Sequence, residues 1–225
     1  MVRYCIRERD VEAEPAADGA VELRRLFGPD RGCDLFEQRV LRLAGGASAE
    51  LGSDGADELL FVLEGTGAVD GDELSPGTGV LVPAPTRARV SNRGSADLVL
   101  LSVLVLDPEG PPERGHVVAN LLESDAGSAT AGRQFRLGPA CASATQFLGY
   151  IPPGRAPDHF HRYDEVLYVL EGEGTLHVGG ETAPLRRGSC VHLPARLVHC
   201  LENTGSEDMT VLGVFRPAGS PAEAY

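Results

Sequence analysis

The chain has 225 residues, 42% of them hydrophobic, and its 28 glycines and 16 prolines make up about a fifth of the sequence. This composition predicts a folded protein with a core, and no apolar run approaches the roughly 20 residues needed to cross a bilayer. Twenty basic and 33 acidic residues give a net charge of −13, which argues against nucleic acid or a membrane as partner. A small molecule is the expected partner.

The types of basic residue and cysteine narrow the chemistry further. All 20 basic residues are arginine, so Schiff-base chemistry through a lysine is excluded. The first ten residues contain no apolar signal core, and the five cysteines form no Cys-x-x-Cys pair. We therefore expect a cytoplasmic protein with free thiols.

Short apolar runs bounded by turn residues recur through the first half of the chain. They cover residues 38–43, 58–63, 80–82 and 98–105. Runs of this length between Gly-rich turns predict β-strands, and closely spaced strands favour a sandwich or jelly roll. We expect an all-β protein in which helices are rare.

Prolines and glycines mark a break near the middle of the chain, at residues 106–115. Because proline cannot join the interior of a sheet, this stretch is expected to be a linker. It puts the boundary near residue 112 and predicts domains of residues 1–112 and 113–225. A second polar stretch, residues 123–132, is expected to be a surface loop without a chemical role.

The two halves share a repeated sequence. Residues 57–67 read Asp-Glu-Leu-Leu-Phe-Val-Leu-Glu-Gly-Thr-Gly, and residues 164–174 read Asp-Glu-Val-Leu-Tyr-Val-Leu-Glu-Gly-Glu-Gly, with eight of eleven positions identical. The offset of 107 residues is close to the expected domain size. We infer a tandem duplication of one domain.

Five of the six histidines lie between residues 159 and 199. His159 and His161 are one residue apart, so on a strand they point to the same face and form a chelating pair. Glu165 follows after a short turn, and His199 is expected to join from a distant strand. Such ligands suit Mn, Fe, Co, Ni, Cu or Zn, so the four residues predict one divalent transition-metal ion per chain. A metal-free cluster of hydrogen-bonded histidines is the alternative.

The spacing of these residues resembles the two motifs of the cupin family, Gly-x5-His-x-His-x3-4-Glu-x6-Gly and Gly-x5-Pro-x-Gly-x2-His-x3-Asn. The matching residues are His159, His161, Glu165 and Gly172 for the first motif, and Gly188, Pro194, His199 and Asn203 for the second. Pro153 stands at the leading glycine of the first motif, and Arg196 at the middle glycine of the second. With the duplication, the resemblance implies two tandem cupin barrels of the double-stranded β-helix, or jelly-roll, type.

The first half departs from the motif at the positions of the ligands. Glu58 corresponds to the glutamate, but Gly52 and Asp54 stand where the histidine pair would be. A single carboxylate does not hold a transition metal well. We therefore expect the metal only in the second barrel, with the first as scaffold or interface.

Three further polar residues are candidates for the site. Gln146 and Tyr150 share one face of the strand that leads toward the histidine pair, and they are expected either to line the pocket or to face outward. Asn203 falls on the same strand face as His199 and is a candidate for orienting the metal ligands.

The fold alone does not fix a reaction, because cupins include dioxygenases, decarboxylases, isomerases, hydrolases and non-catalytic binding proteins. Three histidines and one glutamate resemble the ligand set of quercetinase-like oxygenases, which implies a dioxygenase-type oxidoreductase acting on a small organic molecule. The alternatives are a bicupin hydrolase similar in layout to ureidoglycine aminohydrolase, and a non-catalytic ligand-binding or regulatory cupin. Apolar residues on both faces of the repeated strand also predict a homodimer or a close pairing of the two barrels.

Overall fold

The computed structural model describes residues 3–15, 19–110 and 115–223. These residues are organised almost entirely as β-strands. The described helical segments are short 3-10 turns, η1 (Glu8–Asp10), η2 (Pro29–Arg31) and η3 (Thr130–Gly132). None of the described helical segments has the length or hydropathy needed to span a membrane. The prediction of an all-β protein is confirmed.

The chain divides into two compact units. Unit 1 consists of residues 1–10, 125–137 and 144–225, and unit 2 of residues 11–124 and 138–143. Each unit holds one seven-stranded and one four-stranded sheet. This division differs from the contiguous domains 1–112 and 113–225 expected from the linker, because short segments cross over between the two halves of the sequence. Residue 112 itself lies outside the described residues.

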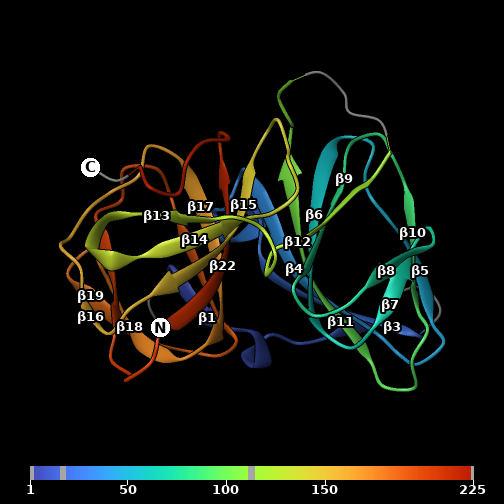
Figure 1. The fold of residues 1–225 in the computed structure, drawn as a ribbon, viewed down its shortest axis with the longest axis horizontal. Coiled ribbons are helices and arrows are strands. Elements are labelled where there is room, and N and C mark those ends of the chain that lie inside the picture. The colour runs from blue at the N-terminus through green and yellow to red at the C-terminus, as the bar shows by residue number, and fades with distance from the viewer. Residues whose placement is uncertain (1–2, 16–18, 111–114, 224–225) are drawn as a thin grey trace. The chain divides into compact units, whose positions relative to one another are not determined.

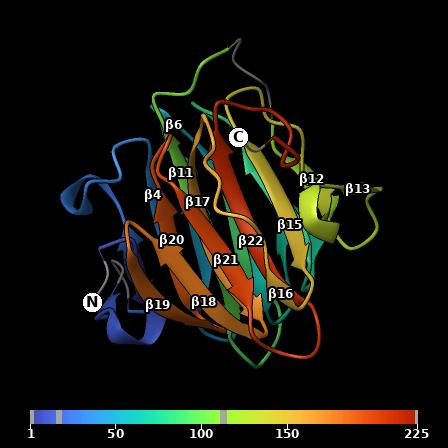
Figure 2. The same cartoon turned by 90° about the vertical axis from the view of Figure 1, so that its left-hand side faces the viewer.

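Unit 1 contains the second copy of the repeat, and its larger sheet has the strand order β1-β20-β17-β22-β15-β14-β13. These strands are β1 (Cys5–Arg7), β20 (Ser189–Leu193), β17 (Asp164–Glu171), β22 (Met209–Arg216), β15 (Thr145–Ile151), β14 (Gln134–Leu137) and β13 (Ala126–Ser128). The smaller sheet consists of β16 (Gly154–Arg155), β21 (His199–Asn203), β18 (Glu173–Val178) and β19 (Glu181–Arg186). Figure 2 shows β20, β17, β22 and β15 side by side.

Unit 2 contains the first copy and repeats this arrangement (Figure 1). Its larger sheet consists of β12 (Val117–Asn120), β9 (Thr78–Val82), β6 (Ala56–Glu64), β11 (Leu98–Leu106), β4 (Phe36–Leu43), β3 (Val21–Phe27) and β2 (Glu14–Pro15). Its smaller sheet consists of β5 (Ser48–Leu51), β10 (Ala88–Asn92), β7 (Gly67–Val69) and β8 (Asp72–Leu74). The four strands expected from the first half are present as β4, β6, β9 and β11.

Each unit has a hydrophobic core between its two sheets. In unit 1, Leu167 and Val169 of β17 belong to the same buried cluster as Leu176 of β18 and Leu201 of β21. The equivalent cluster of unit 2 combines residues of β6 and β11 with residues of β7 and β10. Because side chains alternate along a strand, every second residue of these strands points into the core. This packing produces the two jelly-roll units that the repeat predicts.

Each larger sheet has an edge strand that is distant in sequence from its neighbour in the sheet. β1 pairs antiparallel with β20 of unit 1, with Cys5 opposite Val191. β12 follows the whole first half and pairs with β9 of unit 2, with Val117 opposite Leu81. β9 and β20 are equivalent strands in the duplication. The two added strands therefore complete the same edge in both units.

The outer residues of the repeated strands are buried within the single chain. Tyr168 on β17 is 6% exposed and Phe61 on β6 is 4% exposed. The homodimer was expected because these apolar residues need to be covered. Tyr168 and Phe61 are already covered by residues of the same chain.

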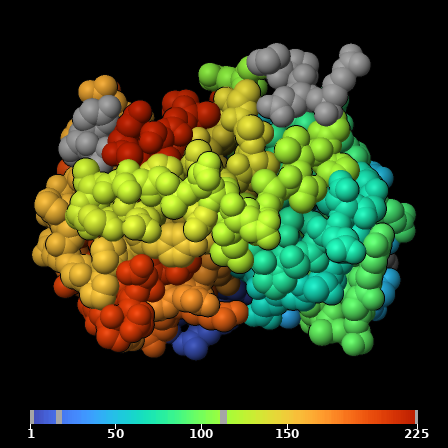
Figure 3. Space-filling model, in the orientation of Figure 1, coloured from blue at the N-terminus to red at the C-terminus, as the bar shows by residue number. Residues whose placement is uncertain are grey.

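The hairpin of β13 and β14 lies on the surface of unit 1, where Figure 3 shows it in yellow-green. β14 pairs with β15, with Phe135 opposite Gly149. The segment 123–132, expected to be a surface loop without a chemical role, contains β13 and the turn η3. It directly precedes Arg133 in the chain.

Candidate metal centre

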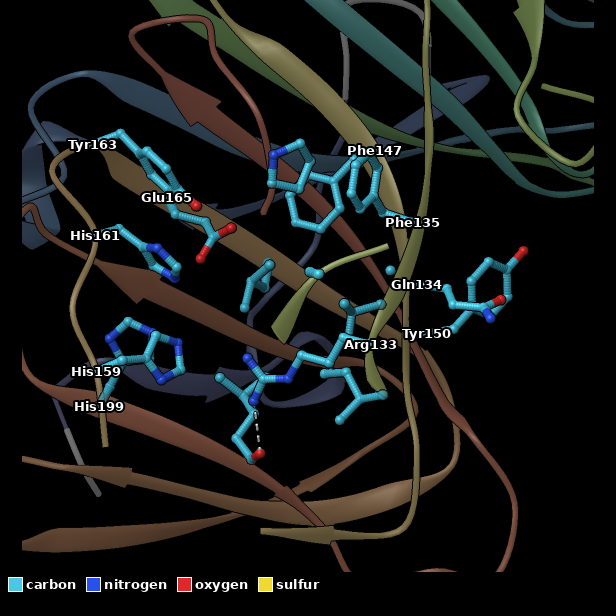
Figure 4. Close-up of a pocket in the computed structure, with 17 residues that line it drawn as sticks. Arg133, Gln134, Phe135, Phe147, Tyr150, His159, His161, Tyr163, Glu165 and His199 are labelled. Carbon is cyan, nitrogen blue, oxygen red and sulfur yellow. Dashed lines mark hydrogen bonds between the residues drawn. The ribbon is translucent and has the colours of Figure 1, made fainter. Parts of the chain in front are cut away.

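Three histidines of unit 1 converge on one point. Among the described residues, His159, His161 and His199 form a group whose ligand nitrogens all lie within 4.8 Å of one another. His199 opens β21, and it exchanges two backbone hydrogen bonds of 3.0 and 2.9 Å with His159. His159 and His161 lie on a short extended segment with one isolated bridge rather than on a continuous strand. The expected chelating pair is nevertheless formed, and Figure 4 shows the three rings facing one cavity.

Backbone carbonyls fix the tautomer of each ring. The Nδ1 atoms donate hydrogen bonds from His159 to the Pro157 oxygen at 3.0 Å, from His199 to the Leu197 oxygen at 2.8 Å, and from His161 to the Glu223 oxygen at 2.8 Å. A carbonyl only accepts, so the proton of each neutral ring is on Nδ1 and the lone pair is on Nε2. The Nε2 atoms of His159 and His199 are buried and have no hydrogen-bond partner. Unpartnered imidazole lone pairs that face one another are what a bound transition-metal ion requires.

Burial keeps these rings neutral. It lowers the pKa of His161 to about 4 and that of His199 to about 3, although a backbone hydrogen bond to each ring opposes the shift. The pKa of His159 is lowered as well, again mainly because burial disfavours the charged ring. All three nitrogens are therefore available as ligands at neutral pH.

Glu165 lines the same cavity but does not belong to the group of converging nitrogens. Its side chain is on β17, 4% exposed, and points into the space beside His161 (Figure 4). Burial raises the pKa of its carboxyl to about 8, with only a partial opposing effect of Arg133. Burial thus favours the protonated form of this carboxyl. The structure thus assembles three of the four expected ligands and places the fourth next to them.

Aromatic and aliphatic side chains form the walls of the cavity, whose volume is about 70 Å³. Tyr163 stacks on His161 with ring centroids 4.5 Å apart and on Phe215 at 4.0 Å. Tyr163 is buried and holds the His161 ring in place. Phe135 and Phe147 lie on the opposite wall. The polar groups of the cavity are the histidines, Glu165, Arg133, Gln134 and the two tyrosines Tyr150 and Tyr163.

The two polar candidates on β15 lie in different surroundings. Tyr150 lines the cavity at the side of Gln134, away from the histidines (Figure 4). Gln146 is 1% exposed and is not among the described residues that line the cavity. The pocket position proposed for Gln146 is therefore not observed. The neighbouring residue Phe147 faces the cavity instead.

The side chain of Asn203 stabilises a turn through hydrogen bonds to the backbone. Its amide donates to the Ile151 and Glu207 carbonyls at 2.8 and 2.7 Å, and its oxygen accepts from the Gly205 amide at 2.9 Å. Asn92 of unit 2 makes the same three bonds, to the Leu43 and Ala96 carbonyls and from the Gly94 amide. Because unit 2 has no histidine cluster at this place, the bonds belong to the fold. The expectation that Asn203 also orients the metal ligands stays a prediction.

Arg133 is a functional candidate that sequence patterns did not indicate. It precedes β14, and its guanidinium extends into the cavity toward His159 and His199 (Figure 4). Burial lowers its pKa from the ordinary value, and Glu165 is among the groups that oppose this shift. No motif surrounds Arg133 in the sequence, and only the pairing of β14 with β15 brings it to the site.

Unit 2 contains the same glutamate in a different setting. Glu58, 1% exposed, accepts hydrogen bonds of 2.6 Å from each of Arg39 Nη2, Ser102 Oγ and the Gly52 amide. The carboxylate is fully occupied by protein donors, one of them a guanidinium. In unit 2 the guanidinium of Arg39 is the cation beside this glutamate. In unit 1 the three histidines lie near the equivalent Glu165.

The registers of the two sheets identify which residues replace this ion pair in unit 1. Glu58 lies opposite Leu104, and Glu165 lies opposite Phe215. In unit 2, Ser102 lies two residues before Leu104 and is opposite Arg39. In unit 1, Gly213 lies two residues before Phe215 and is opposite Phe147. A Cβ atom at residue 213 would lie 2.2 Å from the Phe147 ring, so this ring requires glycine there. The pair Arg39 and Ser102 in unit 2 thus corresponds to Phe147 and Gly213 in unit 1.

The comparisons with known proteins agree with this architecture. The family model described as Cupin domain matches residues 147–215. The oxalate decarboxylase OxdC of Bacillus subtilis, in the structure of a variant, superposes with a TM-score of 0.78 at 15% identity, covering 99% of this chain and 78% of that chain. Residues 147–215 therefore match a cupin domain, and the chain shares its fold with oxalate decarboxylase.

Two curated relatives match shorter stretches of the chain. The oxalate-binding protein of Thermotoga maritima is 35% identical over 67 residues, covering 29% of this chain and 55% of the relative. The quercetin 2,3-dioxygenase of Bacillus subtilis is 35% identical over 80 residues, covering 32% of this chain and 24% of the relative. The chain spans 56%, 38% and 55% of the lengths of the first three curated relatives that it matches.

Proposed function

We propose that this protein binds one divalent transition-metal ion in unit 1 through His159, His161 and His199, with Glu165 as the fourth ligand. The buried, unpartnered Nε2 atoms of His159 and His199 carry the proposal. Their lone pairs face a common point, and buried polar atoms without a hydrogen-bond partner are costly. Imidazole and carboxylate donors suit Mn, Fe, Co, Ni, Cu or Zn.

The chain's own residues prepare this site in three ways. Backbone carbonyls hold each ring in the Nδ1-protonated form, so no reorientation is needed for ligation. The stacked Tyr163 restricts rotation of His161. Phe135, Phe147 and the aliphatic wall limit the entry of water.

We further propose that the site is the active centre of an enzyme acting on a small organic molecule, with a dioxygenase as the first candidate. The similarity to quercetin 2,3-dioxygenase supports this candidate. A bound ion would supply Lewis-acid or redox chemistry next to the substrate. The apolar walls would hold the organic part of the substrate, and Glu165 could accept or return a proton beside it.

Non-catalytic ligand binding is a second candidate, because one of the similar proteins is named an oxalate-binding protein. A hydrolase of the bicupin type stays a third prediction without an observation that favours it. Oxygen consumption, release of a hydrolysis product, and saturable binding without turnover distinguish the three.

The experiment begins with metal analysis of the purified protein by mass spectrometry. We expect about one ion per chain, lost on simultaneous His159→Ala and His161→Ala replacement. His177→Ala is the matched control, because His177 pairs with Glu202 at 2.7 Å outside the histidine cluster. An ion retained by the double variant would contradict the proposal. Oxygen-uptake assays with phenolic, diketone and amino-acid-derived compounds then test for dioxygenase activity.

We also propose a homodimer in the cytoplasm. Association of two copies would cover exposed apolar side chains such as Leu137 and Val198, and the five free cysteines fit a reducing compartment. Sedimentation velocity is expected to give twice the chain mass. A monomer at all protein concentrations would overturn the dimer.

A further inference from the structure

The ring of His161 is held differently from the rings of His159 and His199. His159 and His199 each donate their Nδ1 hydrogen bond to a carbonyl two residues earlier in the chain. His161 donates to the Glu223 carbonyl at 2.8 Å, and this partner is 62 residues away in the sequence. Two of the three rings are therefore oriented by their neighbours in sequence, whereas the third depends on a distant segment that follows β22.

The segment of residues 217–223, here called the strap, is fixed to unit 1 at two points. The Thr145 hydroxyl on β15 donates to the Gly219 carbonyl at 3.0 Å and accepts from the Gly219 amide at 3.0 Å. The strap then makes a turn in which the Glu223 amide donates to the Ser220 carbonyl at 3.1 Å. The turn brings the Glu223 carbonyl to His161, which is the second point.

The strap also forms part of the cavity wall. Pro221 lines the cavity together with His161 and Tyr163. The Tyr163 ring stacks on His161, and its hydroxyl donates to the same Glu223 carbonyl at 3.5 Å. Figure 4 shows the two stacked side chains on the same side of the cavity. Displacement of the strap would therefore free the His161 ring to rotate and would open the cavity beside it.

Much of the strap is exposed to solvent. Residues 217–219 and Glu223 are exposed, and so are both hydrogen bonds between Thr145 and Gly219. A segment with exposed hydrogen bonds and little buried apolar surface opens at a low free-energy cost. The strap is thus the part of the histidine cluster's surroundings that can move without unfolding a sheet.

We propose that the strap is a positioning element of the metal centre, which in its closed form holds His161 for ligation through the Glu223 carbonyl and closes the cavity with Pro221. The inference rests on the proposed function, because it requires His161 to be a ligand. If the ion binds more tightly when the strap is closed, bound ion must favour closure by the same factor.

The first measurement is hydrogen–deuterium exchange of the full chain with and without Co²⁺, read by mass spectrometry. The amides of Gly219, Ala222 and Glu223 are hydrogen-bonded in the closed strap. We expect their exchange to slow at least about threefold when Co²⁺ binds. Equal exchange of the strap with and without Co²⁺ would overturn the inference.

The second measurement loosens the strap at a point outside the cavity. Thr145→Val keeps the shape of the side chain but removes both bonds to Gly219, and Thr145 is not among the described cavity residues. The variant should exchange faster at the strap and bind Co²⁺ at least about threefold more weakly in competition with a chelator. Thr145→Ser retains the hydroxyl and should restore the wild-type affinity.

Thr175→Val is the matched control. Thr175 is a half-buried threonine on β18 of the same unit, and within the described part of the chain its side chain forms no hydrogen bond. This change should leave both the Co²⁺ affinity and the exchange of the strap as in the wild type. If Thr145→Val fails to fold, Ser220→Ala takes its place, because it removes the bond from the Ala222 amide at 3.2 Å within the strap.

Proton NMR of the Co²⁺-loaded protein gives a readout that a merely structural role would not move. Each ligating ring keeps its Nδ1 proton, so three exchangeable signals shifted by the paramagnetic ion are expected. In Thr145→Val the signal of His161 should exchange faster with solvent, and the other two should stay as in the wild type.

Two results with the variant would overturn the inference while leaving the metal proposal intact. These are an unchanged Co²⁺ affinity although the strap exchanges faster, or unchanged exchange of all three imidazole protons. Failure of the wild type to bind Co²⁺, by contrast, would refute the proposed metal centre itself.

Discussion

Arg39 Nη2 lies 2.6 Å from Glu58 Oε1, and it provides in unit 2 the positive charge that a buried carboxylate needs. In unit 1 the residue at the position of Arg39 is Phe147, which cannot pair with Glu165. The same glutamate is therefore held by a fixed cation in one copy of the repeat and left beside three histidines in the other. Among the described residues, the candidate metal centre lies only in the copy whose glutamate lacks the fixed cation.

Glu58→Ala should lower stability without changing metal binding, whereas Glu165→Ala should lower metal binding without lowering the stability of the metal-free protein. Glu58→Ala leaves the Arg39 guanidinium without its buried partner and should lower the free energy of unfolding by about 3 kcal/mol, with metal content unchanged. Glu165→Ala should lower metal affinity and should not destabilise the metal-free protein. Metal analysis and urea denaturation of both variants measure these effects. Equal loss of metal in the two variants would point to a functional site in unit 2.

Gly213→Ala should destabilise the protein by about 1–3 kcal/mol, because the new Cβ would lie 2.2 Å from the Phe147 ring. The double variant with Phe147→Ala should show less than the sum of the two single losses, since removal of the ring removes the clash. Gly55→Ala is the control, as a Cβ there has no heavy atom within 4 Å. Additive losses in thermal unfolding would contradict the contact.

Asn203→Ala and Asn92→Ala should each lower stability by about 1–3 kcal/mol, because each change leaves backbone groups of a turn without their partners. Neither change should alter metal content or the affinity for Co²⁺. Chemical denaturation and metal titration provide the two measurements. A large drop in metal affinity for Asn203→Ala alone would show a role for this residue in orienting the ligands.

The stability of the metal-free protein should depend on pH through Glu165. Burial raises the pKa of this carboxyl from 4.5 to about 8, so the folded state holds a proton that the unfolded state releases above pH 4.5. This proton's contribution to stability is present below pH 4.5 and is lost as the pH rises toward 8.

Glu165→Gln should therefore be more stable than the wild type at pH 8, when both are free of metal. The advantage should decrease as the pH falls and disappear near pH 4.5. The histidine cluster is common to both proteins, so its titration cancels in the difference. Urea denaturation at four pH values in the presence of a chelator measures the effect. A difference independent of pH would show that the carboxyl is ionised in the folded protein.

The duplicated strand and the histidine spacing were sufficient to predict the all-β fold and the converging imidazoles. His159, His161 and His199 are recognisable because metal ligation restricts both residue type and spacing. Asn203 belongs to the same motif, and its side chain stabilises a turn through backbone hydrogen bonds. The same Asn-x-Gly pattern at Asn92 and Gly94, in the half without histidines, was the signal for that structural role.

Other features depend on pairings that are distant in the sequence. Arg133 reaches the cavity only because β14 joins the sheet beside β15, and nothing around it in the chain indicates this. The three residues of β1 are too few for a strand pattern, so their pairing with β20 could not be predicted. Arg196 adopts a φ of 66°, which explains why glycine is usual at this position of the motif.

The exchange of edge strands affects the order in which the protein can fold on the ribosome. Unit 2 needs nothing beyond residue 143, so its sheets can form while later residues are still being synthesised. Unit 1 needs β1, which precedes unit 2 in the chain, together with β20 and β22, which follow unit 2. β1 must therefore remain without its partner strand until β20 has been synthesised, and the histidine cluster can form only after His199 has been added.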